Sequence, residues 1–187
     1  ARRRDHDGGL SPGGDVTVFP TADLDRTLYH FGRADQSISL LAWPLPGYMR
    51  DTRNTLGLEI LTEILNQRLF DRIRQKLGQA YDANAQREQS RAFRDYGLLQ
   101  VTASVAAGQD AAFRDAVAAI VADLQTNPVS QDELDRARKP LLERREDAER
   151  DNANWLALVA RVAADPAVAD AQRSVGDELK GVTPDLI

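Results

Sequence analysis

The sequence predicts an α+β protein in which several helices pack on one face of a mostly antiparallel or mixed β-sheet. The first observation behind this fold class is the order of the predicted elements: a strand, a long helix, two adjacent strands and then several helices. This order departs from the strict alternation that produces a doubly wound parallel sheet. The second is size and composition, because 187 residues with 42% hydrophobic and 28% charged side chains suffice for one domain with a real core.

The first half of the chain predicts a strand, a helix and two further strands. Residues 36–45 begin with alternation and become fully apolar, which predicts a buried strand. Apolar residues then recur at helical spacing over residues 60–77, and Gly78 follows where a helix C-cap belongs. Apolar and polar residues alternate over residues 81–85 and again over 99–105, so two neighbouring strands are expected there.

Helices are expected after these strands. Apolar residues at helical spacing mark a helix over residues 113–124, which Asn127 and Pro128 end. A capping box starts the next helix, because the Ser130 hydroxyl can accept from the backbone N–H of Glu133 while the Glu133 carboxylate reaches back. The predicted buried stripe of that helix consists of Leu134, Ala137 and Leu141.

The two ends of the chain complete the prediction. A shorter helix carries an apolar stripe over residues 155–162, and residues 168–179 predict another helix. Residues 1–30 are rich in glycine, proline and aspartate, which is typical of a linker or domain-boundary segment, with a candidate edge strand at residues 16–19. The domain itself is therefore expected to span residues 31–187.

Composition and motif content exclude several functions. The net charge is −5 with both signs interspersed, which does not suggest a nucleic-acid partner, and no apolar run approaches the length of a membrane span. The absence of cysteine excludes thiol catalysis and cysteine-ligated zinc. The only histidines, His6 and His30, lack the spacing by which a helix presents two metal ligands. We therefore expect no metal site, nucleic acid or membrane contact for this chain.

The segment RLFDRIRQKLGQAY, from Arg68 to Tyr81, resembles a segment of the insulinase/pitrilysin family of zinc metallopeptidases. The resemblance extends to residues 32–36, 128–134 and 152–156, and so to most of the chain. It is strongest to the last of the four homologous domains in long, single-chain bacterial members. That domain closes with one more helix and a strand after a Thr-Pro start, so the resemblance implies a domain truncated at its end.

The resemblance implies a non-catalytic domain of a clamshell-shaped endopeptidase. In such enzymes two halves enclose a peptide chamber, and the first domain binds zinc through an inverted H-x-x-E-H motif, which this chain lacks. Zinc is therefore expected in the N-terminal domain of the parent protein, and this fragment alone is expected to be inactive. In the family's C-terminal half, an arginine near the end of the long helix and a tyrosine seven positions later reach the zinc-bound peptide. The match places these substrate-binding roles on Arg74 and Tyr81.

The chemistry of these two side chains fits that role. Fixed N–H and O–H donors aimed at a developing oxyanion can lower a peptidase barrier by about 3 to 4 kcal/mol per donor. Gly78 permits the chain reversal that brings Tyr81 back toward the helix end. The residues alone also allow plainer roles. Arg74 can complement the helix dipole together with Arg72 and Lys76, and Tyr81 can be a half-buried strand residue with its hydroxyl in water.

The sequence and its family resemblance leave three alternative functions. The first is enclosure and positioning of a peptide substrate by a domain that completes a distant zinc site. The second is a structural or peptide-binding subunit of the same fold, similar to the core proteins of respiratory complexes. The third, an unrelated interaction domain, requires the spacing from Arg74 to Tyr81 to be coincidence. The expected partners are a peptide and the other domains of the parent chain, and the isolated fragment can form a homodimer through surface left uncovered. The resemblance favours the periplasm over the cytoplasm.

Overall fold

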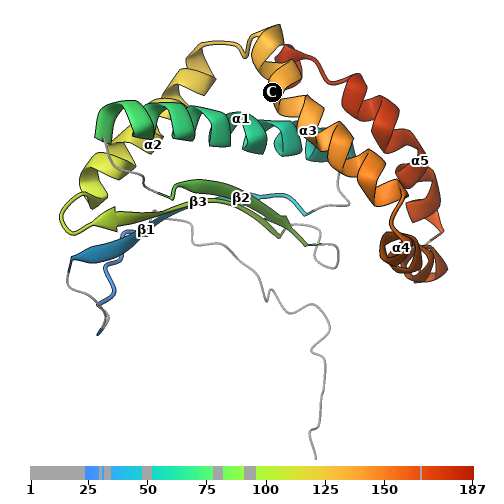
Figure 1. The fold of residues 1–187 in the computed structure, drawn as a ribbon, viewed down its shortest axis with the longest axis horizontal. Helices are drawn as coiled ribbons and strands as arrows, with labels where there is room; N and C mark the ends of the chain where they lie inside the picture. Colours follow the sequence, from blue (N-terminus) through green and yellow to red (C-terminus); the bar gives the residue numbers. More distant parts are fainter. Residues whose placement is uncertain are drawn as a thin grey trace, which may run out of the picture.

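A computed structural model of the protein describes residues 24–29, 31, 35–47, 52–77, 82–90, 96–164 and 166–187, with the backbone alone described for residues 36, 52–53, 73–77 and 167. Its elements are β1 (Gln36–Leu45), α1 (Thr52–Leu77), β2 (Asn84–Gln89), β3 (Gly97–Ala106), α2 (Asp110–Thr126), α3 (Gln131–Glu149), α4 (Asn152–Ala164), α5 (Ala167–Lys180) and the short 3₁₀ helix η1 (Pro184–Leu186) (Figure 1). The predicted α+β class is confirmed.

The three described strands form an antiparallel sheet in the order β1-β3-β2. Leu99 of β3 lies opposite Trp43 of β1, and Val101 lies opposite both Leu41 and Ala85. Because alternate residues of a strand point to opposite faces, these apolar side chains share one face of the sheet. That face lies toward α1, and α1, α2, α3 and α5 lie on this side of the sheet, with α4 beyond its end (Figure 1).

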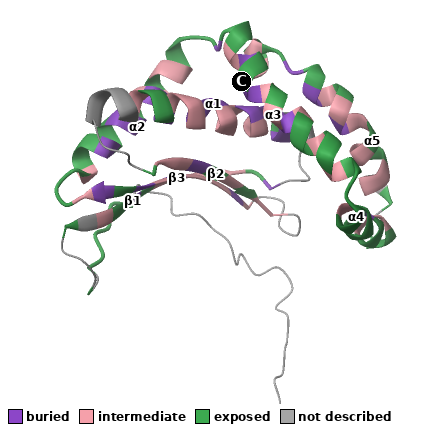
Figure 2. Ribbon diagram, viewed as in Figure 1, coloured by how far each residue is buried: buried purple, intermediate pink, exposed green. Residues whose placement is uncertain are grey.

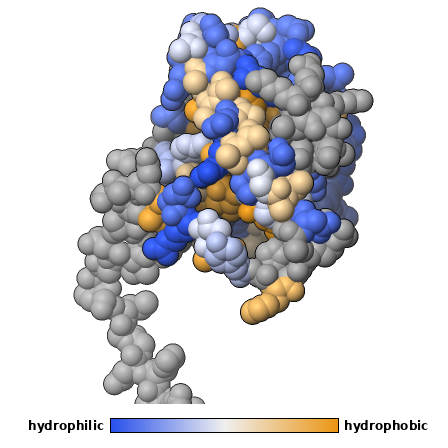
Figure 3. All heavy atoms as spheres, turned by 90° about the vertical axis from the view of Figure 1, so that its left-hand side faces the viewer, coloured by the Kyte–Doolittle hydropathy of each residue, from blue (hydrophilic) through white to orange (hydrophobic). Residues whose placement is uncertain are grey.

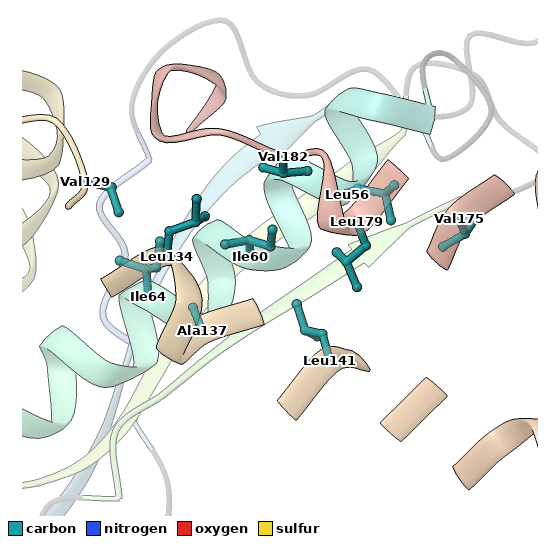
Figure 4. Packing of buried hydrophobic residues seen from close by; sticks show 10 residues of the cluster. All are labelled: Leu56, Ile60, Ile64, Val129, Leu134, Ala137, Leu141, Val175, Leu179 and Val182. Atoms are coloured by element: carbon teal, nitrogen blue, oxygen red, sulfur yellow. The ribbon is translucent and has the colours of Figure 1, made fainter. Parts of the chain in front are cut away.

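Helix α1 is buried on two sides. Ile60 and Ile64 belong to a cluster with α3 and α5 (Figure 4), whereas Leu65 and Leu69 belong to a second cluster with the sheet and α2. Figure 2 shows that buried positions recur along α1. Successive helix residues are rotated by about 100°, so the two stripes occupy different sides of the same helix. Helix α1 is therefore the middle layer between the sheet and the pair α3 and α5.

The strand predicted at residues 36–45 is present as β1, but the prediction that it is buried is wrong. Among the described strands β1 lies at an edge of the sheet and has one exposed face, while the candidate edge strand at residues 16–19 lies outside the described residues. Ile38 is 78% exposed and Leu40 is 58% exposed. Their side chains lie on the face of the sheet that no described helix covers, whereas Leu41 and Trp43 pack against the second cluster. The sequence of β1 is apolar on both faces, so its hydrophobicity does not show that only one face is covered.

The helix predicted over residues 155–162 is present as α4, but most of its apolar stripe is exposed. Trp155, Leu156 and Val159 are exposed, and Leu158 is the residue of α4 that is buried. The Trp155 indole N–H instead donates to the carbonyl oxygen of Glu149 at 2.7 Å. This helix is apolar around much of its circumference, so periodicity cannot decide which side packs against α3 and α5.

The start of α2 is tied to β1 by a carboxylate. Ser37 and Ser39 of β1 donate from their hydroxyls to Asp110 Oδ1 at 2.7 and 3.1 Å. These bonds, led by the one from Ser37, hold the pKa of Asp110 below its ordinary value. Asp110 also occupies the first turn of α2, where a negative charge complements the helix dipole.

We expect Asp110→Asn to lower the free energy of unfolding by roughly 1 kcal/mol at neutral pH, a modest value because the carboxylate is partly solvated. Since the folded-state pKa is depressed, this stability is present above the unfolded pKa and is lost as pH falls through the folded pKa. Urea unfolding at pH 7 and pH 3 measures both effects. The control is Asp115→Asn on the exposed side of α2. If Asp110→Asn lowers the free energy of unfolding by the same amount at pH 7 and pH 3, the stabilisation does not come from the ionised Asp110 carboxylate.

Candidate functional site

The candidate site lies where α1 ends and the chain returns toward β2. Arg74 is in the last turn of α1, and its side chain is outside the described residues. Tyr81 also lies outside the described residues. The end of α1 and the start of β2 lie at the same end of the molecule (Figure 1). Figure 3 looks onto this end and shows apolar residues at the surface between hydrophilic ones.

Two polar contacts join α1 to β2 behind this end. Asn66 Nδ2 donates to the carbonyl oxygen of Ala85 at 3.0 Å, and the Ala85 N–H donates to Asn66 Oδ1 at 2.7 Å. Farther along, Arg87 Nη2 lies 3.1 Å from Glu59 Oε1. As the residue number rises along α1 it falls along β2, so the helix and the strand run antiparallel.

A second polar cluster joins α1 to α2 and α3. The Arg68 guanidinium donates to both carboxylate oxygens of Glu133, at 2.7 and 3.0 Å, and to Asp123 Oδ2 at 2.7 Å. Its hydrogen bond to Glu133 is the main reason that the pKa of Arg68 is raised and that the pKa of Glu133 is lowered. The predicted capping bond is present as well, because the Ser130 hydroxyl accepts from the Glu133 N–H at 3.2 Å. This cluster fixes the helix that carries Arg74.

The described residues do not fit a zinc site. Within the part of the chain that the structure describes, no three His, Cys, Asp or Glu side chains come together as a metal-binding group. Both histidines lie outside that part, and the sequence has no H-x-x-E-H motif. In the same described ranges, no helix is long and apolar enough to cross a membrane.

The face of the sheet that no described helix covers is a second surface available to a ligand. Ile38 and Leu40 lie on it in β1, and the register places Gln86 and Glu88 of β2 on the same face. All four side chains are exposed. The face therefore combines apolar side chains at one edge with hydrogen-bonding groups at the other.

Sequence reasoning missed Asn66 and Arg68. Arg68 had a detectable signal, because a cation stands between Leu65 and Leu69 of the buried stripe, where a charge needs a partner. Asn66 had none, because its partner is a backbone group in a distant strand.

The fold and these contacts are those of an α+β domain that is built around one long central helix and has no zinc motif. The chain belongs to the family of peptidase M16 inactive domains, whose model matches residues 10–141. This match confirms the resemblance to the insulinase/pitrilysin metallopeptidases that the segment from Arg68 to Tyr81 indicates.

Known proteins agree with this assignment. The chloroplastic stromal processing peptidase of Arabidopsis thaliana is 35% identical over 110 residues, which are 59% of this chain and 8% of that protein. The inactive peptidase domain of a proposed zinc protease from Bordetella parapertussis has the same fold, with a TM-score of 0.65 at 21% identity over 82% of this chain and 84% of that one.

A larger protein also contains this fold. The periplasmic protease PqqL of Escherichia coli matches 81% of this chain with 16% of its own, at a TM-score of 0.65 and 12% identity. The chain thus spans a small part of PqqL and of the curated relatives that it matches.

Proposed function

We propose that this domain encloses and positions a peptide substrate in a zinc endopeptidase whose metal is bound by another domain of a longer parent chain. The observation that carries the proposal is the one-sided covering of the sheet. Helices α1, α2, α3 and α5 lie on one side of the sheet, and the other face exposes Ile38 and Leu40. Such a face can line a chamber in which a peptide lies extended.

Arg74 and Tyr81 are the residues that we propose contact the peptide. A guanidinium and a phenol can each donate to the scissile carbonyl or to the oxyanion that develops from it. Two features of α1 support this role for Arg74. The helix is packed on two sides, and polar contacts hold it to β2 and to α3. A donor on such a rigid element loses little conformational entropy when the substrate binds.

Complementation tests this function. The 187-residue chain is assayed for peptide hydrolysis with added zinc, first alone and then mixed with the remaining domains of its parent protein. We expect activity in the mixture alone, because the zinc ligands and the completing domain are then both present. Bound peptide without hydrolysis in either assay would favour the alternative, a peptide-binding or structural subunit without peptidase activity.

Within an active mixture or parent enzyme, we expect Tyr81→Phe to lower turnover by about two orders of magnitude, because the loss of one donor to the developing oxyanion costs about 3 kcal/mol. The substitution removes one hydroxyl, so the thermal midpoint should change little. The matched control is Tyr29→Phe, because Tyr29 is 93% exposed. Unchanged peptidase kinetics in Tyr81→Phe would remove Tyr81 from the site.

The periplasm remains the expected location of the parent protein. The location stated for PqqL supports it, since that protease contains a domain of the same fold. Fractionation of cells that express the parent protein, followed by detection of this domain, tests the location.

A further inference from the structure

Helix α4 has an apolar side that no described element covers. Leu156 is 73% exposed, Val159 is 63% exposed and Trp155 is 49% exposed. At about 100° per residue these three side chains fall within roughly a third of the helix circumference, so they form one continuous stripe. The sequence of α4 contains a single charged residue, Arg161. Monomeric proteins rarely leave a continuous apolar face to water, so a partner is expected on this stripe.

The packing of the core does not account for this stripe. Among the described residues, neither of the two apolar clusters contains a residue of α4. Leu158 is the residue of this helix that is buried, and it lies outside the stripe. Helix α3, by contrast, places charged residues such as Asp132 and Arg136 on its exposed side. The apolar character of α4 is therefore unusual for a helix on the surface of this domain.

Side-chain hydrogen bonds hold the stripe in a fixed orientation. Asn154 Nδ2 donates to the carbonyl oxygen of Ala148 at 3.0 Å, and the Trp155 indole N–H donates to that of Glu149 at 2.7 Å. Both carbonyls belong to the last turn of α3, where carbonyl groups lack the usual helical partner. Because α4 is fixed to the end of α3 in this way, its face loses little conformational freedom when a partner binds.

The size of the stripe indicates the kind of partner that it fits. Helix α4 has 13 residues and is therefore about 20 Å long. One face of that length buries well under the roughly 800 Å² per partner of a stable complex between free proteins, which disfavours a dimer of this chain. A domain of the same chain needs less area, because the covalent connection supplies an effective concentration in the millimolar range. PqqL and the stromal processing peptidase, of which this chain spans a small part, contain much further sequence.

We propose that α4 is the docking face for a neighbouring domain of the parent chain, which covers Trp155, Leu156 and Val159 with an apolar surface. The Trp155 indole is the anchor of this contact, since buried aromatic side chains carry much of the binding energy of protein interfaces. The proposal shares with the proposed function only the existence of a longer parent chain. It adds a face at which the domain is held, and this face lies beyond the end of the sheet (Figure 1).

Hydrogen exchange of the α4 backbone tests the proposal. We expect the amides of residues 152–164 to exchange at least about tenfold more slowly in the parent protein than in the isolated 187-residue chain, because a docked helix opens only after it is released. The amides of α2, residues 110–126, are the internal reference and should exchange equally in both proteins. Equal exchange of α4 in the two proteins would overturn the proposal, and so would a slowing of equal size in α2.

A pair of matched variants locates the contact. Leu156→Glu places a charge in the stripe and should restore fast exchange of α4 in the parent protein. Leu28→Glu is the control, because Leu28 is 88% exposed and lies outside α4, so exchange of α4 should stay slow. Slow exchange in Leu156→Glu would contradict the docking. If α4 is instead protected in the isolated chain, and more so at higher protein concentration, the partner is a second copy and the proposal is wrong.

This test and the tests of the proposed function can fail separately. Hydrogen exchange needs no peptidase activity, so unprotected α4 amides in the parent protein would leave the proposed role in substrate binding intact. A parent protein without peptidase activity would contradict the proposed function, whereas the exchange of α4 would still show whether a neighbouring domain covers the stripe.

Discussion

Leu69→Ala should lower the free energy of unfolding by about 3 to 4 kcal/mol, the largest stability effect that we expect from a single substitution here. Leu69 is fully buried on α1, where it packs with the sheet and α2. Truncation removes its transfer free energy and leaves a cavity, which close-packed neighbours fill only in part. Urea unfolding of the 187-residue chain, monitored by circular dichroism, measures the loss.

The next residue along the helix provides the control. Phe70 is a larger hydrophobic side chain, but it is 63% exposed. Phe70→Ala should therefore change the free energy of unfolding by less than about 1 kcal/mol. Equal losses in the two variants would contradict the orientation of α1, because they would place both side chains in the core.

Arg68→Ala should lower the free energy of unfolding by about 2 to 3 kcal/mol, which is the second large stability effect that we expect. The variant leaves the Glu133 carboxylate, whose side chain is only 15% exposed, without its strongest partner. Asp123 adds little to this estimate because its side chain is more exposed and its charge is better screened. Arg68→Lys keeps the charge but cannot donate to both carboxylate oxygens from a planar fork, so its loss should be intermediate.

The pH dependence of the Arg68→Ala variant distinguishes this ion pair from ordinary packing. The hydrogen bond from Arg68 lowers the pKa of Glu133, so the stabilisation is present above the unfolded pKa and is lost as pH falls through the folded pKa. The free energies of unfolding of wild type and Arg68→Ala should therefore differ most at neutral pH and least in acid. Arg173→Ala is the control, because Arg173 pairs with Asp170 on the exposed side of α5, away from Glu133. If the difference in the free energy of unfolding between wild type and Arg68→Ala does not change with pH, then the loss of stability comes from packing of the aliphatic part of Arg68.

The fold could be predicted closely where local pattern and tertiary packing agree. Residues 113–124 show clear helical periodicity, and α2 contains them, while the Ser130 cap begins α3 as expected. Hydrophobic periodicity does not predict which side of a segment is buried when the segment is apolar on more than one side. The exposure of Ile38 and of Trp155 depends on which neighbours are present, and periodicity carries no information about neighbours. Strand β2 begins at Asn84 instead of residue 81.

The candidate site is predictable only in part, for a physical reason. The proposed roles of Arg74 and Tyr81 come from a local segment whose residue types and spacing resemble those of a known family. The contacts that hold α1 in place join groups far apart in the chain. Asn66 reaches a backbone amide that every residue type except proline presents, so the identity of Ala85 gives no hint of the bond. Arg68 and Glu133 are complementary charges, but many such pairs in this sequence lie in solvent.

The two-sided burial of α1 makes the domain indivisible. Both apolar clusters contain side chains of α1. The sheet and the α3–α5 layer should therefore unfold in a single cooperative transition. Insertion of one residue between Ile64 and Leu65 would rotate everything that follows by about 100°. The stripe formed by Leu65 and Leu69 would then turn away from the sheet, and the last helical turn would swing with it. The count of residues along α1 is therefore constrained as strongly as their chemical character.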